Sequence, residues 1–218
     1  MALKLHQHPL SSFCQKVIIA LYETGTPFEA VHLDLGDEGE SSKFLALWPI
    51  GKMPVLEDGG HVVPETSIII EHLDLTHPGK ARMIPADPDL ALRTRLLDRI
   101  FDLHVQQPMQ AIVADRLRPD ERKDAVAVQE ARAQLHKAYG VLERELAGPW
   151  AVGEAFTMAD CAAAPALFYA GALEPFADYP RLSAYYDRLR VHPSVARTFS
   201  EARPFHGFFP GAELLNVA

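Results

Sequence analysis

The first 76 residues alternate between the spacings typical of strands and of helices, and this alternation limits the possible folds more than any other feature of the chain. Leu3 and Leu5 alternate with polar neighbours, as in a half-buried strand. Apolar side chains then recur at helical spacing from Cys14 to Tyr22, and Gly25 ends that helix. The further elements expected here are a strand over 28–33, a helix over 41–48, a hairpin over 54–64 and a helix over 66–76.

The resulting order, βαβαββα, predicts a mixed sheet with helices packed on its faces. A β-α-β opening requires a parallel, right-handed crossover, and the hairpin adds antiparallel strands. Residues 78–88 contain three prolines and one glycine, which is typical of a linker. We therefore expect an α/β domain over residues 1–77, a linker over 78–88 and a second domain over 89–218.

The second domain contains no convincing strand pattern. Its expected helices cover residues 89–118, 120–147, 158–172, 181–192 and 194–201. Pro108 lies inside the first of them and predicts a kink, while Thr157 and Asp160 have the spacing of a capping box. The aromatic tail after residue 202 is expected to be irregular. The predicted fold class is thus an α/β domain followed by an all-helical domain.

Composition and charge exclude several classes of function. The 218-residue chain has a formal net charge of −8, and no basic stripe predicts binding to nucleic acid. It has no run of about 18 apolar residues that could span a membrane, and no apolar leader at its N-terminus, so we expect a cytoplasmic protein. The two cysteines, Cys14 and Cys161, are too few for a disulfide scaffold or a cysteine-based zinc site.

Two serines stand where the first helix begins. Ser11 and Ser12 precede the apolar helical pattern, so either can cap the helix. A hydroxyl at this position lies among unpaired backbone N–H groups at the positive end of the helix dipole, where an anion or a thiolate is stabilised. The pattern by itself agrees with simple capping and with anion binding.

Two further segments bring polar groups to the ends of elements. Lys52, Met53 and Pro54 precede the hairpin, where a cis peptide bond would turn the Met53 backbone toward a peptide-like ligand, and a trans bond would leave an ordinary edge-strand proline. Glu65 and Thr66 precede the apolar run of the next helix. They can hold an amino-acid head group or merely cap that helix.

Four segments together resemble the cytosolic glutathione transferase superfamily over essentially the whole chain. They read SSFCQKVIIAL, PIGKMPVLED, PETSIIIEHL and GPWAVGEAFTMADCAAAPAL, in the order and at the separations of that family. With serine at the activating position, the sequence is most similar to the zeta, tau and phi classes. The resemblance implies a thioredoxin-like N-terminal domain, glutathione as co-substrate, no metal, and a homodimer formed through the helix after Glu65 and the first helix of the second domain.

The resemblance also implies roles for single residues. Ser11 matches the serine that activates glutathione, and Ser12 is the neighbour with which it could be confused. The other residues implied to bind glutathione are Met53 and Pro54 for its cysteinyl unit, Glu65 and Thr66 for its γ-glutamyl group, and Lys52 near its carboxylates.

In this family the electrophile binds between the domains. The residues expected to line that pocket here are Phe101, His104, Val105 and Pro108, although such a stripe at helical spacing is also typical of core. Phe205, Phe208 and Phe209 of the tail would fold over this pocket or pack outside it.

The expected function is detoxifying transfer of glutathione to a hydrophobic electrophile. One alternative is a glutathione-binding or regulatory protein of the same fold without turnover. Another is a zeta-like glutathione-dependent isomerase, which is disfavoured because VIIALYE lacks the arginine-rich run of that class. A thiol transferase would need a reactive Cys14, since serine stands where the nucleophilic cysteine of such enzymes lies.

Overall fold

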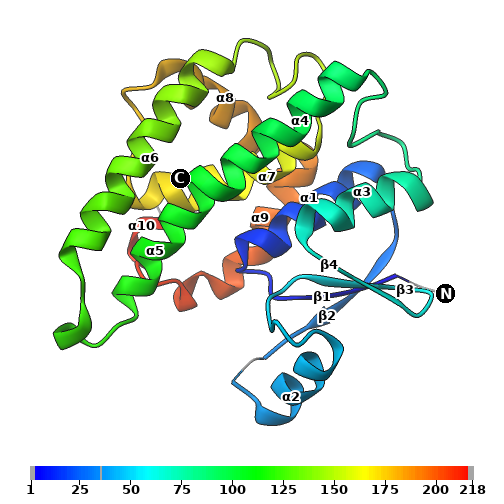
Figure 1. Ribbon diagram of the computed structural model, residues 1–218, viewed down its shortest axis with the longest axis horizontal. Coiled ribbons are helices and arrows are strands. Elements are labelled where there is room, and N and C mark those ends of the chain that lie inside the picture. The colour runs from blue at the N-terminus through cyan, green and yellow to red at the C-terminus, as the bar shows by residue number, and fades with distance from the viewer. Residues whose placement is uncertain (1–2, 35, 216–218) are drawn as a thin grey trace.

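The computed structural model describes residues 3–34 and 36–215 and contains the two parts expected from the sequence (Figure 1). The first part comprises β1 (Leu3–Gln7), α1 (Ser12–Thr24), β2 (Phe28–His32), α2 (Glu38–Leu47), β3 (Val55–Asp58), β4 (His61–Pro64) and α3 (Thr66–Thr76). The predicted order βαβαββα is confirmed.

The sheet has the strand order β2-β1-β3-β4. β1 and β2 are parallel, whereas β3 is antiparallel to both β1 and β4, as the crossover and the hairpin require. α1 and α3 lie on the side of the sheet that faces the helical part, and α2 lies on the opposite side (Figure 1). The start of α1 therefore lies next to the junction of the two parts.

α1 begins and ends where its sequence signals predict. Ser11 is its N-cap, and its hydroxyl oxygen accepts a hydrogen bond from the Cys14 backbone N–H. Gly25 ends the helix with φ 71°, a left-handed conformation that costs glycine little because it has no Cβ. Cys14 and Cys161 are both buried and both free, so the structure contains no bridge between them.

The named elements of the second part are all helices. Its elements are α4 (Pro88–Ile100), the π-helix η1 (Phe101–Gln106), α5 (Gln107–Arg116), the 3₁₀ turn η2 (Asp120–Arg122), α6 (Ala125–Glu145), α7 (Met158–Leu173), α8 (Pro180–Val191), α9 (Pro193–Ala202), the 3₁₀ helix η3 (Arg203–Phe208) and α10 (Ala212–Leu215). The loop between α6 and α7 contains two isolated β-bridges, Trp150 with Gly153 and Val152 with Ala155. None of the described helices is long and apolar enough to span a bilayer.

Two details differ from the sequence-based expectation. The predicted kink near Pro108 takes the form of the π-helical stretch η1 just before it, because proline donates no hydrogen bond and its ring crowds the carbonyl four residues earlier. The tail is more regular than expected, since it forms η3 and α10.

α7 is the centre of the core. Every one of its residues from Met158 to Ala170 is buried, and it packs against both α1 and α4. The predicted capping box is present, and Asp160 also accepts hydrogen bonds from the Ala151 N–H and the Tyr185 hydroxyl. One continuous hydrophobic cluster includes side chains from α1, α3, α4 and α7, so the two parts share a core.

Candidate active site

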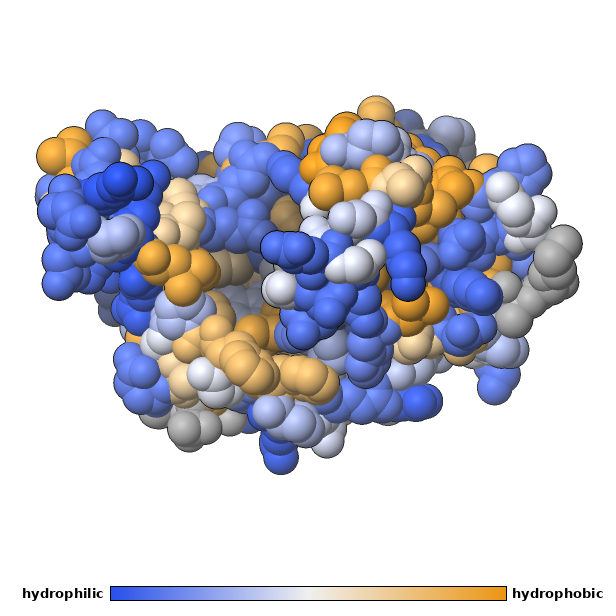
Figure 2. All heavy atoms as spheres, turned by 90° about the horizontal axis from the view of Figure 1, so that it is seen from below, coloured by the Kyte–Doolittle hydropathy of each residue, from blue (hydrophilic) through white to orange (hydrophobic). Residues whose placement is uncertain are grey.

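A cavity of about 720 Å³ opens at the start of α1. Its described lining residues are His8, Leu10, Ser11, His32, Leu33, Asp34, Glu40, Met53, Phe205 and Phe208. These residues come from the β1–α1 loop, the end of β2, α2, the loop before β3, and η3 of the tail. Viewed from the side of α2, the surface of the molecule is visibly hollowed (Figure 2).

The two serines at the start of α1 have different surroundings. Ser11 lines the cavity, and its oxygen accepts only a long hydrogen bond, 3.4 Å, from the Cys14 N–H. The same hydroxyl also lies close to the Cys14 side chain, where its hydrogen bond opposes the rise that burial causes in the pKa of that thiol. Ser12 is buried, and its oxygen accepts a hydrogen bond from the Gln106 side-chain amide. Of the two serines, Ser11 is the one that lines the cavity.

The segment before the hairpin reaches the same cavity through Met53. The Met53–Pro54 peptide bond is cis, which settles an alternative left open by the sequence. Met53 lines the cavity, Pro54 is buried, and Lys52 is exposed in the loop that leads to them.

Glu65 and Thr66 form the N-terminal end of α3. Glu65 is exposed and has φ 70°, a conformation that costs a residue with a Cβ about 1–2 kcal/mol. Its side chain makes no capping hydrogen bond, and its carboxylate lies near enough to Arg99 to favour the charged guanidinium. Thr66 is buried. The start of α3 thus combines an exposed carboxylate, a hydroxyl and backbone N–H groups.

A buried cluster of charges connects α1 and α3 to the helical part. The Lys16 ammonium lies 2.5 Å from an Asp98 oxygen, 2.8 Å from an Asp102 oxygen and 3.0 Å from the Ser67 hydroxyl. Arg99 contacts both aspartates from the outer side. Burial raises the pKa of the Asp102 carboxyl, and the Lys16 ammonium opposes this effect. The cluster thus contains two cationic and two anionic side chains, so its formal charges balance.

The four residues predicted to line the electrophile pocket differ in exposure. Phe101 and Val105 have no exposed surface, and Phe101 stacks on Tyr185 with ring centroids 6.4 Å apart. Pro108 is buried, whereas His104 is exposed. None of these four is among the described residues that line the cavity beside Ser11.

The cavity instead has an aromatic wall from the tail. Phe205 and Phe208 line it, while Phe209 is buried against the Tyr169 ring. His8 packs edge-on against Phe205, with ring centroids 5.2 Å apart. Burial, followed by the neighbouring His32, lowers the pKa of His8, so its imidazole is neutral near pH 7. Sequence reasoning missed both histidines because no helical or strand spacing connects them to the tail.

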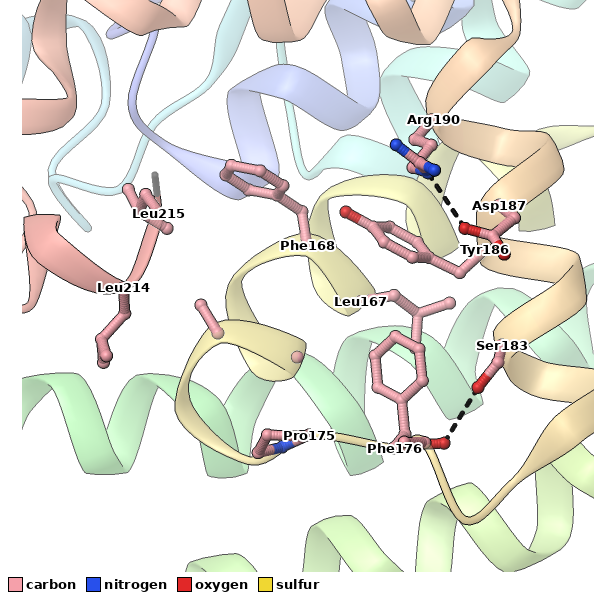
Figure 3. Close-up of a pocket in the computed structure, with 13 residues that line it drawn as sticks. Leu167, Phe168, Pro175, Phe176, Ser183, Tyr186, Asp187, Arg190, Leu214 and Leu215 are labelled. Carbon is pink, nitrogen blue, oxygen red and sulfur yellow. Dashed lines mark hydrogen bonds and ion pairs between the residues drawn. The ribbon is translucent and has the colours of Figure 1, made fainter. Parts of the chain in front are cut away.

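A second cavity, of about 400 Å³, lies within the helical part between α7, α8 and α10 (Figure 3). Leu167, Phe168 and Phe176 supply apolar walls, and Arg190 is paired with Asp187 at 3.0 Å. This cavity has neither a helix N-terminus nor an unpaired charge among its described lining residues. We therefore locate the candidate active site at Ser11.

Cys14 is not suited to thiol chemistry. Its side chain has no exposed surface, and burial raises the pKa of its thiol to about 12. A thiol that is both protonated and enclosed cannot serve as a nucleophile or as a redox partner.

Comparison with known proteins agrees with this geometry. Residues 5–81 match the family model described as glutathione S-transferase, N-terminal domain, and residues 125–188 match the glutathione S-transferase, C-terminal domain. A glutathione S-transferase of Pseudomonas putida is 30% identical, with 91% of this chain and 92% of that protein aligned. Glutathione S-transferase 3 of Zea mays is 31% identical, with 90% of this chain and 92% of that protein aligned.

A solved structure extends the comparison to three dimensions. The glutathione S-transferase of Methylobacterium radiotolerans, crystallised in complex with glutathione sulfonate, is 29% identical and superimposes with a TM-score of 0.80, over 91% of this chain and 94% of that one. The chain belongs to the glutathione S-transferase family. Its fold, a small four-stranded α/β part followed by an all-helical part, is the fold of that family.

Proposed function

We propose that this protein binds reduced glutathione in the cavity beside α1, stabilises its thiolate with the Ser11 hydroxyl and transfers it to a hydrophobic electrophile. The observation that carries the proposal is the difference between the two serines. Ser11 lines a cavity at the positive end of a 13-residue helix, whereas Ser12 is buried and its hydroxyl accepts a hydrogen bond from Gln106.

The surrounding groups suit the parts of the glutathione molecule. The Met53 backbone, at the cavity wall, would pair with the cysteinyl unit, and buried Pro54 would support it. At the start of α3 the exposed Glu65 carboxylate and the Thr66 hydroxyl would hold the γ-glutamyl ammonium and carboxylate. The exposed Lys52 ammonium would lie near the glycyl carboxylate.

The Ser11 hydroxyl contributes to the first chemical step. A free thiol with a pKa near 8.5 is about 3% ionised at pH 7, and lowering that pKa by about two units makes it roughly three-quarters ionised. A hydrogen bond to a charged acceptor and a helix N-terminus together supply the required 2–3 kcal/mol. The thiol proton leaves to solvent, and the sulfur lone pair forms the new bond to carbon. The electron pair of the bond broken at that carbon departs with a leaving group or, in an addition to a conjugated double bond, moves along the π system and is protonated from solvent.

The electrophile would bind against the tail. Leu10, Phe205 and Phe208 offer an apolar wall on the side of the cavity where the sulfur of glutathione would lie. Among the residues of the α4–α5 run, exposed His104 remains a candidate for direct contact with the electrophile. Buried Phe101, Val105 and Pro108 would support the pocket from behind.

We also propose a cytoplasmic homodimer formed through α3 and α4. These two helices carry large apolar side chains on the surface of the single chain, which is unusual for a face exposed to water. They are Ile68, Leu75, Leu90, Leu92 and Leu96, all between 47% and 76% exposed. Sedimentation analysis of the wild type and of Leu92→Glu tests this part of the proposal.

An ultraviolet titration of the bound glutathione thiolate tests the role of Ser11. The wild type should lower the thiol pKa by about two units, and Ser11→Ala should return it toward the free value. Ser12→Ala is the matched control and should leave the depressed pKa in place. Glutathione affinity is measured in parallel, so that loss of binding is not mistaken for loss of ionisation.

Each other outcome contradicts a definite part of the proposal. Loss of thiolate stabilisation in Ser12→Ala alone would mean that the assignment of the serine is wrong. Binding without any pKa depression in the wild type would identify a non-catalytic glutathione-binding protein. No binding at all would show that this member of the family uses another ligand.

A further inference from the structure

A carboxylate and two imidazoles converge at the C-terminal end of α3, away from Glu65 and the candidate active site. One oxygen of Asp58 lies 2.9 Å from Nε2 of His72 and 2.7 Å from Nε2 of His77. Single ligand atoms of the three residues all lie within 4.8 Å of one another. The side chains are 19%, 24% and 35% exposed, respectively, so the cluster is half-buried but open to solvent.

The fold holds the three residues from two elements. Asp58 ends β3 directly before the hairpin turn, in which Gly59 and Gly60 both have positive φ. His72 lies in the last two turns of α3, and His77 is the C-cap of that helix, with its N–H bonded to the Leu73 carbonyl. α3 packs on the β3–β4 hairpin (Figure 1), and this packing brings the three side chains together.

The donor set identifies the kind of ion that fits. Two imidazole nitrogens and one carboxylate oxygen suit Zn²⁺ and related transition-metal ions, whereas Ca²⁺ and Mg²⁺ require mostly oxygen ligands. Zinc binds such atoms at about 2.0–2.1 Å, which separates neighbouring ligand atoms by roughly 3.3 Å in a tetrahedron. The two nitrogen–oxygen separations therefore need to widen by only about half an ångström.

We propose that Asp58, His72 and His77 bind one divalent transition-metal ion, with zinc as the representative ion, and that water completes the coordination. To bind the ion, each imidazole must present an unprotonated Nε2. Any proton that lies between an Nε2 and Asp58 therefore moves to Nδ1 of the same ring or leaves to solvent. The ion joins the β3–β4 hairpin to the end of α3 and stabilises the native state. This site is independent of the proposed glutathione chemistry.

This proposal departs from the sequence-based expectation of no metal. That expectation came from the family resemblance, and the scarcity of cysteine excludes thiolate sites but not imidazole sites. The spacing of Asp58, His72 and His77 matches no common metal motif, and only the packing of α3 on the hairpin unites them.

Zinc titration of the untagged, chelator-treated chain tests the site. Isothermal calorimetry should give one equivalent per chain, and added zinc should raise the Tm. His72→Ala and Asp58→Asn should each weaken binding on the order of 100-fold, because each removes one of three ligands. The matched control is His136→Ala, which removes an imidazole that pairs with a single carboxylate, Glu174, at 2.8 Å.

A second measurement keeps the proposal testable if a variant fails to fold. Cobalt(II) bound to the wild type should give the intense visible absorption of a tetrahedral nitrogen–oxygen site, and one equivalent of zinc should abolish it. The absence of saturable binding by the wild type would overturn the proposal. Equal zinc affinity in the wild type and His72→Ala would overturn it as well, and so would a loss of affinity in His136→Ala as large as in His72→Ala.

Discussion

Replacement of Lys16 by methionine should destabilise the protein strongly, because Lys16 compensates two buried carboxylates. Lys16 is 1% exposed, and its ammonium contacts Asp98, which is also 1% exposed, and Asp102, which is 8% exposed. Methionine keeps most of the length and apolar volume of the side chain, so the packing of α1 is largely preserved. The variant therefore tests charge compensation rather than space filling.

The magnitude follows from the arrangement of the remaining charges. Without Lys16, two buried carboxylates share Arg99 alone, whose side chain is 48% exposed and therefore compensates them less well. Removing one partner of a buried ion pair costs about 3–5 kcal/mol, because the other charge remains desolvated. That loss is a large share of the 5–15 kcal/mol that is typical of folded proteins.

Urea unfolding at a fixed protein concentration provides the measurement, with the free energy obtained by linear extrapolation. The control is Lys123→Met, which removes an ammonium from the exposed Lys123–Asp120 pair and should leave the midpoint nearly unchanged. Combining Lys16→Met with Asp98→Asn should recover about 1 kcal/mol or more, since the two groups interact directly. A Lys16→Met variant within about 1 kcal/mol of the wild type would refute the reasoning.

Two further predictions concern titratable groups. The His192 imidazole lies 2.8 Å from the Glu23 carboxylate, and this hydrogen bond holds the Glu23 pKa below its ordinary value of 4.5. The stability that Glu23 contributes is therefore complete above pH 4.5 and is lost as the pH falls through the lowered pKa. Unfolding free energies between pH 6 and pH 3 should fall more steeply in the wild type than in Glu23→Gln, and parallel curves would contradict this. Separately, Cys14 and Cys161 should not react with a thiol reagent such as dithionitrobenzoate in the native protein and should both react in denaturant, because both are buried and free. Rapid reaction of the native protein would reopen the thiol-transferase alternative.

The architecture was predictable because the spacing of apolar residues and the positions of turn residues indicate each helix and strand locally. Alternation at Leu3 and Leu5, the glycine after α1 and the hairpin turn at Gly59 each specify their element without reference to the rest of the chain. The order of the strands then follows from the handedness of the crossover.

The candidate site was less predictable because its decisive contacts are long-range. Neither local capping rules nor spacing distinguishes Ser11 from Ser12, and the contact that separates them comes from Gln106, 94 residues later. Periodicity showed that Phe101 and Val105 lie on an inward-facing stripe, but not that this stripe packs into the core beside Tyr185. The sequence also did not show on which side of the cavity the aromatic residues of the tail lie.

The π-helical stretch Phe101–Gln106 has a consequence for how the long α4–α5 run presents its faces. A π turn accommodates one more residue than an α turn, so it acts as a one-residue insertion within the helix. At 3.6 residues per turn, that insertion rotates everything beyond it by about 100° relative to an uninterrupted α-helix. Asp98 precedes this stretch and contacts Lys16, whereas Gln106 is the last residue of the stretch and donates a hydrogen bond to Ser12. In a regular α-helix, Gln106 would point in a different direction relative to Asp98. The contacts between the two parts of the protein therefore depend on the helical pitch of the α4–α5 run as well as on its side chains.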